Sequence, residues 1–209
     1  TVSFTTTNSG GTTTYTWTND NTSIGLAASG SGDIGSFAAV NTGNSPQIAH
    51  ITVTPHFDNG NTSCDGPTMT FTITVNPTAE VEQVDNQVIC NQGSTAEVDF
   101  TTTNANGTTT YTWTNDNTSI GLAASGSGDI ASFTATNSGN SPQIAHITVT
   151  PHFDNDNTSC SGATMSFTIT VNPTAEAEQA DNQVVCNTDN TATVSFTTTN
   201  SGGTTTYTW

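Results

Sequence analysis

Residues 164–171 read TMSFTITV, and this stretch decides the fold class. Its hydrophobic side chains alternate with Thr and Ser, so an extended chain here has one apolar face and one polar face. A period of two is typical of a β-strand that buries one face. The same alternation at residues 98–100, 111–113 and 145–149 predicts further short strands, and weaker signals lie at 81–89 and 132–136.

These segments predict about seven short strands per domain, joined by turns such as Asn106-Gly107. No segment shows helical periodicity. Trp113, alone of its kind on the third predicted strand, matches the buried Trp of immunoglobulin-like sandwiches. We therefore expect an all-β fold of immunoglobulin-like β-sandwich domains, with Trp113 buried.

The sequence is an internal repeat. Residues 108–130 are identical to residues 12–34, which places the two copies 96 positions apart (108 − 12). Residues 193–209 are identical to residues 1–17, two periods apart. The period is too long for a solenoid unit of about 20–50 residues, and it matches a β-sandwich of about 100 residues. The sequence therefore predicts tandem domains in a linear array or fibre.

The linker between domains is the sequence VNPTAE at residues 75–80, which recurs at 171–176. Because Pro ends a strand and stiffens a connection, we place the boundaries there. Residues 1–76 form an incomplete repeat without its first strand, 77–172 a complete repeat, and 173–209 the opening strands of a third. We expect neither end of the sequence to be a natural terminus.

The charge excludes several functions. The chain has no Lys or Arg and 17 Asp and Glu, a net charge of −17. Without cations it cannot neutralise phosphates, so neither nucleic acid nor an anionic membrane surface is an expected partner. No apolar run has the length of a membrane span, and we expect no insertion. With no nucleophile–base motif and no cation for an anionic transition state, we expect no enzyme and no catalytic residue.

Each full period contains two cysteines: Cys64 and Cys160 share one repeat position, and Cys90 and Cys186 share the other. Such a pattern indicates disulfides in an oxidising compartment. One pairing joins Cys90 to Cys160 inside the complete repeat, leaving Cys64 and Cys186 to pair outside this sequence. That pairing requires residues 87–90 to lie beside the last strand. The alternatives are a staple between neighbouring domains and free thiols.

An acidic loop, DNDN at residues 154–157, has the oxygen-rich composition of a calcium loop. In the preceding copy the loop reads DNGN, and further acids gather near each junction. The candidate calcium ligands are Asp154, Asp156, Asp58, Glu80, Glu82 and Asp85. No spacing among them matches a complete ligand set, and the alternative is a solvated loop that keeps the chain soluble.

Four segments resemble the PKD-like repeats of giant cell-surface proteins of Bacteroidota, including gliding-motility adhesins. They are YTW at 111–113, SIGLAASGSGDI at 119–130, ITVTP at 147–151 and FTITVNP at 167–173. Residues 114–117 read TNDN, where standard PKD domains have a Gly-Asp-Gly-like turn, so the resemblance is to PKD-like repeats. It implies a cell-surface stalk or fibre, exported by the type IX route.

The function we expect is that of a structural repeat region in a very long secreted or cell-surface adhesin, giving reach and stiffness. Its partners would be neighbouring copies or repeats, and surface glycans. Two alternatives remain open at this point. Each repeat could itself bind polysaccharide, or the repeats could be a spacer in a secreted hydrolase.

Overall fold

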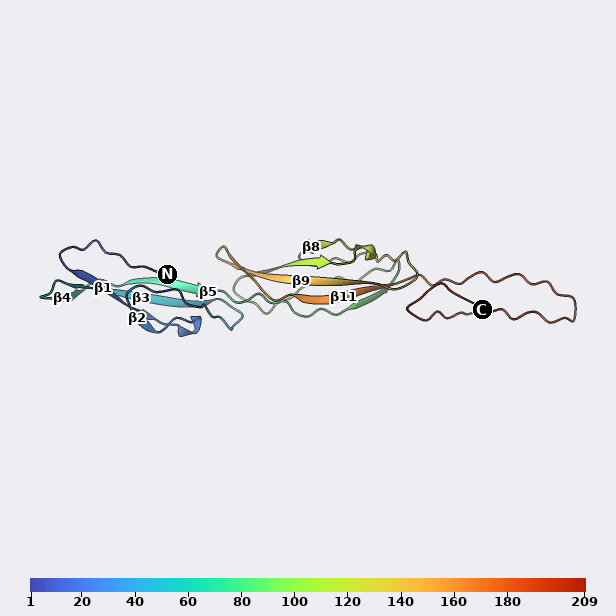
Figure 1. Cartoon of the computed structure of the whole chain (residues 1–209), viewed down its shortest axis with the longest axis horizontal. Coiled ribbons are helices and arrows are strands. Elements are labelled where there is room, and N and C mark those ends of the chain that lie inside the picture. The colour runs from blue at the N-terminus through green and yellow to red at the C-terminus, as the bar shows by residue number, and fades with distance from the viewer. The chain divides into compact units, whose positions relative to one another are not determined.

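The computed structural model describes residues 1–209 and shows an all-β chain with two sheets, consistent with a β-sandwich (Figure 1). The predicted all-β class is confirmed. The only helical elements are two single 3-10 turns, η1 (Thr22–Ile24) and η2 (Thr118–Ile120). Neither has the length or hydrophobicity to cross a membrane.

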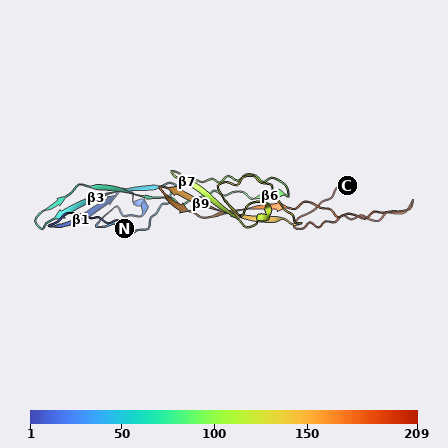
Figure 2. The same cartoon turned by 90° about the horizontal axis from the view of Figure 1, so that it is seen from above.

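The first sheet is formed by residues of the first repeat. Its strands are β1 (Thr12–Asn19), β2 (Ser29–Ser31), β3 (Gln47–Asp58), β4 (Ser63–Asp65) and β5 (Met69–Val75). All pairings are antiparallel, and β3 lies between β1 and β5; Figure 2 shows β1 and β3 side by side. The outer edge of β5 pairs with no other strand.

The second sheet repeats this arrangement and adds one strand. The matching strands are β7 (Thr108–Asn115), β8 (Ser125–Ser127), β9 (Gln143–Asn155), β10 (Thr158–Ser161) and β11 (Met165–Asn172). The added strand, β6 (Gln87–Cys90), runs parallel to β11 and pairs with its last four residues. The edge that is open on β5 is therefore covered on β11.

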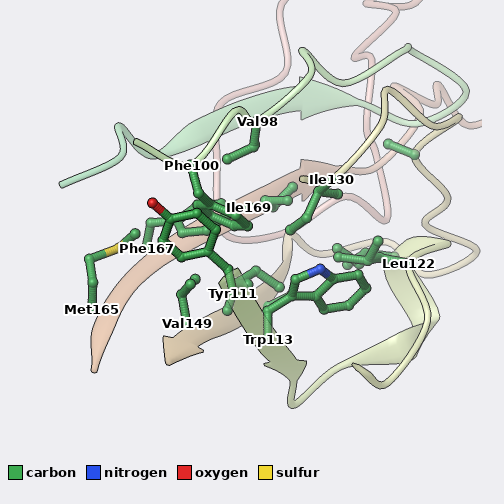
Figure 3. Close-up of a cluster of buried hydrophobic side chains, with 14 of the residues drawn as sticks. Val98, Phe100, Tyr111, Trp113, Leu122, Ile130, Val149, Met165, Phe167 and Ile169 are labelled. Atoms are coloured by element: carbon green, nitrogen blue, oxygen red, sulfur yellow. The ribbon is translucent and has the colours of Figure 1, made fainter. Parts of the chain in front are cut away.

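The opposite layer of each repeat contains isolated bridges in place of long strands. Val98 bridges to Ile130, and Ser94 bridges to Thr134. The strands predicted at 98–100 and 132–136 are present only in this form, and the one at 81–89 is reduced to β6. Figure 3 shows Val98, Phe100 and Ile130 facing Tyr111 and Trp113 across the core.

The apolar alternation produces the core as predicted. Trp113 is buried, and so are all four apolar residues of β11. On the polar face of β11, Ser166 is exposed while Thr168 and Thr170 are half-buried, and the Thr168 N–H donates a hydrogen bond to Asn86 Oδ1 (2.7 Å). The core of the second repeat has fifteen buried residues, against seven in the first.

In the glycine-rich segment at residues 125–128, packing requires glycine at position 126, and the alternation of apolar residues does not reveal this. Gly126 lies on the indole of Trp113, and a Cβ there would be 2.2 Å from the ring atom Cζ2. Gly30 and Trp17 show the same contact at the same distance. Only glycine fits, so β8 can pair with β7 directly over the ring.

The chain divides into two compact units that do not coincide with the sequence repeat. Unit 1 contains Thr1–Glu80, Thr102–Thr109 and His152–Gly162. Unit 2 contains Val81–Thr101, Thr110–Pro151 and Ala163–Trp209. The first repeat thus forms one unit with the base of the second. The domain boundaries proposed from sequence, at residues 76 and 172, stay a prediction.

Residues 173–209 form no strand. Most of their side chains are exposed, including Val184 at 97%. Local bonds nevertheless order the segment: the Ala192 N–H donates to Gln183 Oε1 (2.8 Å), and the Glu178 N–H donates to the Thr197 carbonyl (2.9 Å). Both bonds have counterparts 96 positions earlier, at Ala96–Gln87 and Glu82–Thr101.

Candidate interface between repeats

Within unit 1, the base of the second repeat lies against the end of the first. Asn44 Nδ2 donates to the Thr103 carbonyl, and the Ala105 N–H donates to the Asn44 carbonyl, both at 2.8 Å. Asn155 Nδ2 donates to Asn76 Oδ1, also at 2.8 Å. Three hydrogen bonds therefore join loops that are far apart in sequence.

Asn104 holds the linker between the repeats. Its Oδ1 accepts from the Glu80 N–H (2.7 Å), and its Nδ2 donates to the Thr78 carbonyl (3.1 Å). Beside it, Thr103 Oγ1 donates to the Glu80 carboxylate (2.8 Å). Because donors and acceptors of the linker backbone are both satisfied, residues 77–80 are part of the folded unit.

Apolar contacts accompany these bonds. Pro77 is fully buried in the linker, and Ala79 is 2% exposed. A Cβ on Gly162 would lie 1.7 Å from the Ala79 carbonyl oxygen, so the second repeat carries glycine where its base meets the linker. Phe153 is completely buried, and its ring covers Gly107.

The linker bonds recur one period later within unit 2. The Glu176 N–H donates to Asn200 Oδ1 (2.8 Å), and Asn200 Nδ2 donates to the Thr174 carbonyl (3.0 Å). The Ser201 N–H donates to the Asn140 carbonyl (2.8 Å), as Ala105 does to Asn44. The same contact therefore belongs to the repeat and not to one position in the chain.

Two grooves on unit 1 have no occupant from this chain. One, of about 440 Å³, lies at the base of the first repeat and is lined by Tyr15, Pro55, Gly66 and Met69, among others. The other, of about 280 Å³, runs along the end of β5 from Ile73 to Asn76 and reaches Cys160. The hydroxyls of Thr13 and Tyr15, two residues of the larger groove, are buried without a hydrogen-bond partner.

The candidate calcium ligands do not converge. No three His, Cys, Asp or Glu side chains come together as a metal site. Asp58 accepts the Gly60 N–H (2.6 Å) within its own loop, while Glu80 and Glu82 accept Thr hydroxyls (2.8 and 2.5 Å). Asp85 and Asp156 are exposed, and Asp154 is half-buried. Calcium takes six to eight oxygen ligands, so binding by these six residues stays a prediction without geometric support.

All four cysteines are free thiols, and the predicted Cys90–Cys160 disulfide is not formed. Residues 87–90 do lie beside the last strand, but β6 runs parallel to it, so Cys90 pairs with Asn172 at its far end. Cys160 pairs with Phe153 of β9, ten residues from Gln143, which pairs with Val171 of β11. At 3.3 Å per residue this is about 33 Å. Pairing of Cys64 and Cys186 outside this sequence stays a prediction.

Each repeat carries a His–Asp pair at the same position of its sheet, and the first repeat has a second one, in which His56 Nδ1 lies 2.6 Å from Asp65 Oδ1. The His146 N–H donates to Asp116 Oδ1 (2.7 Å), and its ring Nδ1 lies 2.8 Å from Oδ2. The backbone hydrogen bond, followed by the side-chain bond, lowers the pKa of Asp116. The pKa of Asp20 is lowered in the same way, first by the His50 N–H. Each of the two equivalent pairs joins the long central strand of its sheet, β3 or β9, to the residue that follows β1 or β7.

The residues of the interface were missed by the sequence reasoning, which sought acids and cysteines. Asn44, Asn104 and Gly162 carry no chemical motif. Their only signal is the density of Asn and Gly in the loops at the two ends of each repeat. The comparisons add no family: no family model matches the chain, and the search of curated proteins found no match.

Proposed function

We propose that the chain is a structural repeat region of a very long secreted or cell-surface adhesin. In this proposal, tandem immunoglobulin-like domains of the PKD-like kind form a stalk that provides reach and stiffness. Neighbouring repeats are its main partners, and surface glycans are the expected target of the whole protein. The chain itself is extracellular and has no catalytic role.

The recurrence of the linker bonds carries this proposal. Asn104 and Asn200 bind their linkers through the same two backbone groups, 96 residues apart. A tether between independent domains does not need a bound linker, whereas a stalk that must keep its direction does. The absence of cations and the uniform acidity also favour a chain that stays solvated at high local density.

Small-angle X-ray scattering tests the stiffness. The double variant Asn104→Ala/Asn200→Ala is expected to broaden the distribution of interatomic distances, while the control Asn190→Ala, an exposed Asn in the last segment, leaves the profile unchanged. Identical profiles for both variants would contradict a stalk. A glycan array with the 209-residue chain addresses the alternative, because specific glycan binding would favour repeats that are themselves the adhesive module.

A further inference from the structure

The two cysteine positions of a repeat lie at opposite ends of its sheet. Cys90 ends β6 and pairs with Asn172, the last residue of β11. Cys160 lies in β10, whose hairpin with β9 is at the other end of the same sheet. A disulfide requires Cα atoms within about 7 Å of each other, so the two thiols of one repeat cannot pair.

Cys90 lies at the junction with the repeat that follows. The next residue, Asn91, donates its backbone N–H to the Asn172 carbonyl and its Nδ2 to Thr174 Oγ1, both at 2.9 Å. Thr174 belongs to the linker that leads out of the second repeat. Ile89 packs on the core, so the Cys90 side chain is on the opposite, exposed face of β6.

Cys160 lies at the junction with the repeat that precedes. It lines one groove with Asn76, the residue after β5. Asn76 Oδ1 accepts a hydrogen bond (2.8 Å) from Asn155 Nδ2 in the β9–β10 hairpin. Asn76 is the counterpart of Asn172, one period of 96 residues earlier. The cysteine of the β10 position therefore lies beside the residue against which the cysteine of the β6 position pairs.

The two junctions of the chain are built alike. The same backbone hydrogen bond of 2.8 Å joins the incoming repeat to the preceding one at each of them, from Ala105 to Asn44 and from Ser201 to Asn140. The loops that meet are therefore the same ones at both junctions. A repeat that enters in this way brings its own β10 cysteine to the end of β11, where Cys90 already lies.

We propose that a disulfide crosses each junction and joins Cys90 of one repeat to the counterpart of Cys160 in the repeat that follows it. This inference rests on the proposed function, because it requires the array of repeats to continue in one chain. It gives the two cysteines of a repeat to two different neighbours. Each linker, held by the hydrogen bonds of Asn104 or Asn200, then has a covalent bond beside it.

The bond forms by thiol–disulfide exchange, for which glutathione disulfide is a sufficient oxidant. The Cys90 thiolate attacks glutathione disulfide and displaces one glutathione. The thiolate of the following repeat then attacks Cys90 Sγ of the mixed disulfide, which forms the Sγ–Sγ bond and displaces the second glutathione. The two thiols lose two protons and two electrons, and glutathione disulfide takes up both.

These disulfides determine which residues carry tension along a stalk. From one disulfide to the next, the covalent path runs only through residues 160–186 or their counterparts. Residues 91–159, which contain β7, β8 and β9, lie outside this path. A pull along the stalk therefore loads the sulfur–sulfur bonds and leaves these strands folded.

The test compares the 209-residue chain with a chain lengthened by one period, in which a second copy of residues 77–172 follows Asn172. Only the lengthened chain contains both partners of a junction, Cys90 and a Cys160 counterpart 166 positions later (160 + 96 − 90). Both chains are reduced, incubated with glutathione disulfide and separated by size, and the monomers are mapped by peptic digestion. We expect one disulfide, between these two cysteines, in the lengthened chain, and none in the 209-residue monomer.

Two serine variants of the lengthened chain provide the matched control. Cys90→Ser is expected to abolish the disulfide, whereas Cys160→Ser removes the equivalent thiol from the first junction and is expected to leave the disulfide at full yield. A Cys90–Cys160 bond within one repeat, a disulfide in the 209-residue monomer, equal behaviour of the two variants, or no disulfide in the lengthened chain would each overturn the proposal.

Stretching single molecules of the lengthened chain measures the consequence. The disulfide is expected to shorten the fully extended length by about 580 Å, because 166 residues at about 3.5 Å each are enclosed by the bond. Reduction or Cys90→Ser is expected to restore that length. The scattering test of the stalk uses the 209-residue chain, which contains no such pair. No disulfide in the lengthened chain, with scattering that still broadens in Asn104→Ala/Asn200→Ala, would therefore refute the disulfide alone, and a disulfide with unchanged scattering would refute the stalk alone.

Discussion

The two repeats carry nearly the same strand and bury it differently. In the second repeat Met165 is 8% and Phe167 2% exposed; in the first, Met69 is 51% exposed and Phe71 only partly buried. The strands themselves read TMSFTITV at residues 164–171 and TMTFTITV at 68–75, so their own sequence does not explain the difference. The second repeat has residues 77–90 over this strand, and the first has open grooves there. A segment distant in sequence therefore decides how much of a nearly identical strand becomes core.

The largest expected effect comes from shortening the same side chain in both repeats. Phe167→Ala is expected to lower the free energy of unfolding by about 3–5 kcal/mol, because it leaves a cavity in a closed core. Phe71→Ala is expected to cost less than about half of that, since the first core is open on this side. Chemical denaturation of both variants measures the difference. Equal losses of unfolding free energy would show that the first core is as closed as the second.

A smaller effect is expected from closing the first core in cis. A fusion that places a copy of residues 77–96 ahead of Thr1 is expected to stabilise the first repeat by about 2–3 kcal/mol, through burial of Met69 and its neighbours. The same fusion with Asp at the position of Ile89 is the control, and it is expected to give no gain. A fusion without effect on denaturation would show that the missing cover is not the cause of the open core.

The linker asparagines are expected to act more weakly. Asn104→Ala removes two hydrogen bonds to the linker and leaves the Glu80 N–H without its acceptor, which costs about 1–2 kcal/mol in unit 1. Asn200→Ala removes the same bonds from an exposed segment, and water replaces them with little loss. Urea denaturation of the two variants is the measurement. If Asn200→Ala lost more unfolding free energy than Asn104→Ala, the bound linker would contribute more in the exposed segment than in unit 1, contrary to this expectation.

The equivalent pairs His146–Asp116 and His50–Asp20 are expected to give the smallest effect, and the same one in both repeats. The folded pKa of Asp116 lies below its unfolded value, so its contribution is present above about pH 4 and is lost as pH falls through the folded pKa. Asp116→Asn and Asp20→Asn should each flatten the acid side of the stability profile slightly. Urea midpoints between pH 7 and pH 3 provide the check. A free energy of unfolding that falls as pH rises from 4 to 7 would contradict a stabilising Asp116 with a lowered pKa.

Periodicity in the sequence was sufficient for the all-β class and the longer strands, but at residues 98–100 it predicted a strand where the structure has one isolated bridge. Alternation predicted the all-β class, the strand at residues 164–171, and the burial of Trp113, because a period of two places side chains on known faces. It did not predict β8, because Gly126 is selected by the ring beneath it and not by its own propensity. The length of β6 and its parallel direction were also out of reach, since both depend on the partner strand.

The candidate sites were predicted less well for a related reason. Paired cysteines and clustered acids are visible in sequence, but their partners depend on the direction in which strands run. The parallel pairing of β6 places Cys90 at the far end from Cys160. The residues that do meet, such as Asn104 and Glu80, are a common amide and a backbone group, and no motif identifies them.

Hydrogen exchange followed by mass spectrometry tests whether the covering segment decides how well β5 and β11 are buried. Peptides from residues 69–75 and 165–172 are compared in the 209-residue chain. We predict fast exchange for residues 69–75 and slow exchange for 165–172. Addition of a synthetic peptide of residues 77–96 should slow the first to approach the second. Equal exchange without the peptide, or no protection with it, would contradict the account.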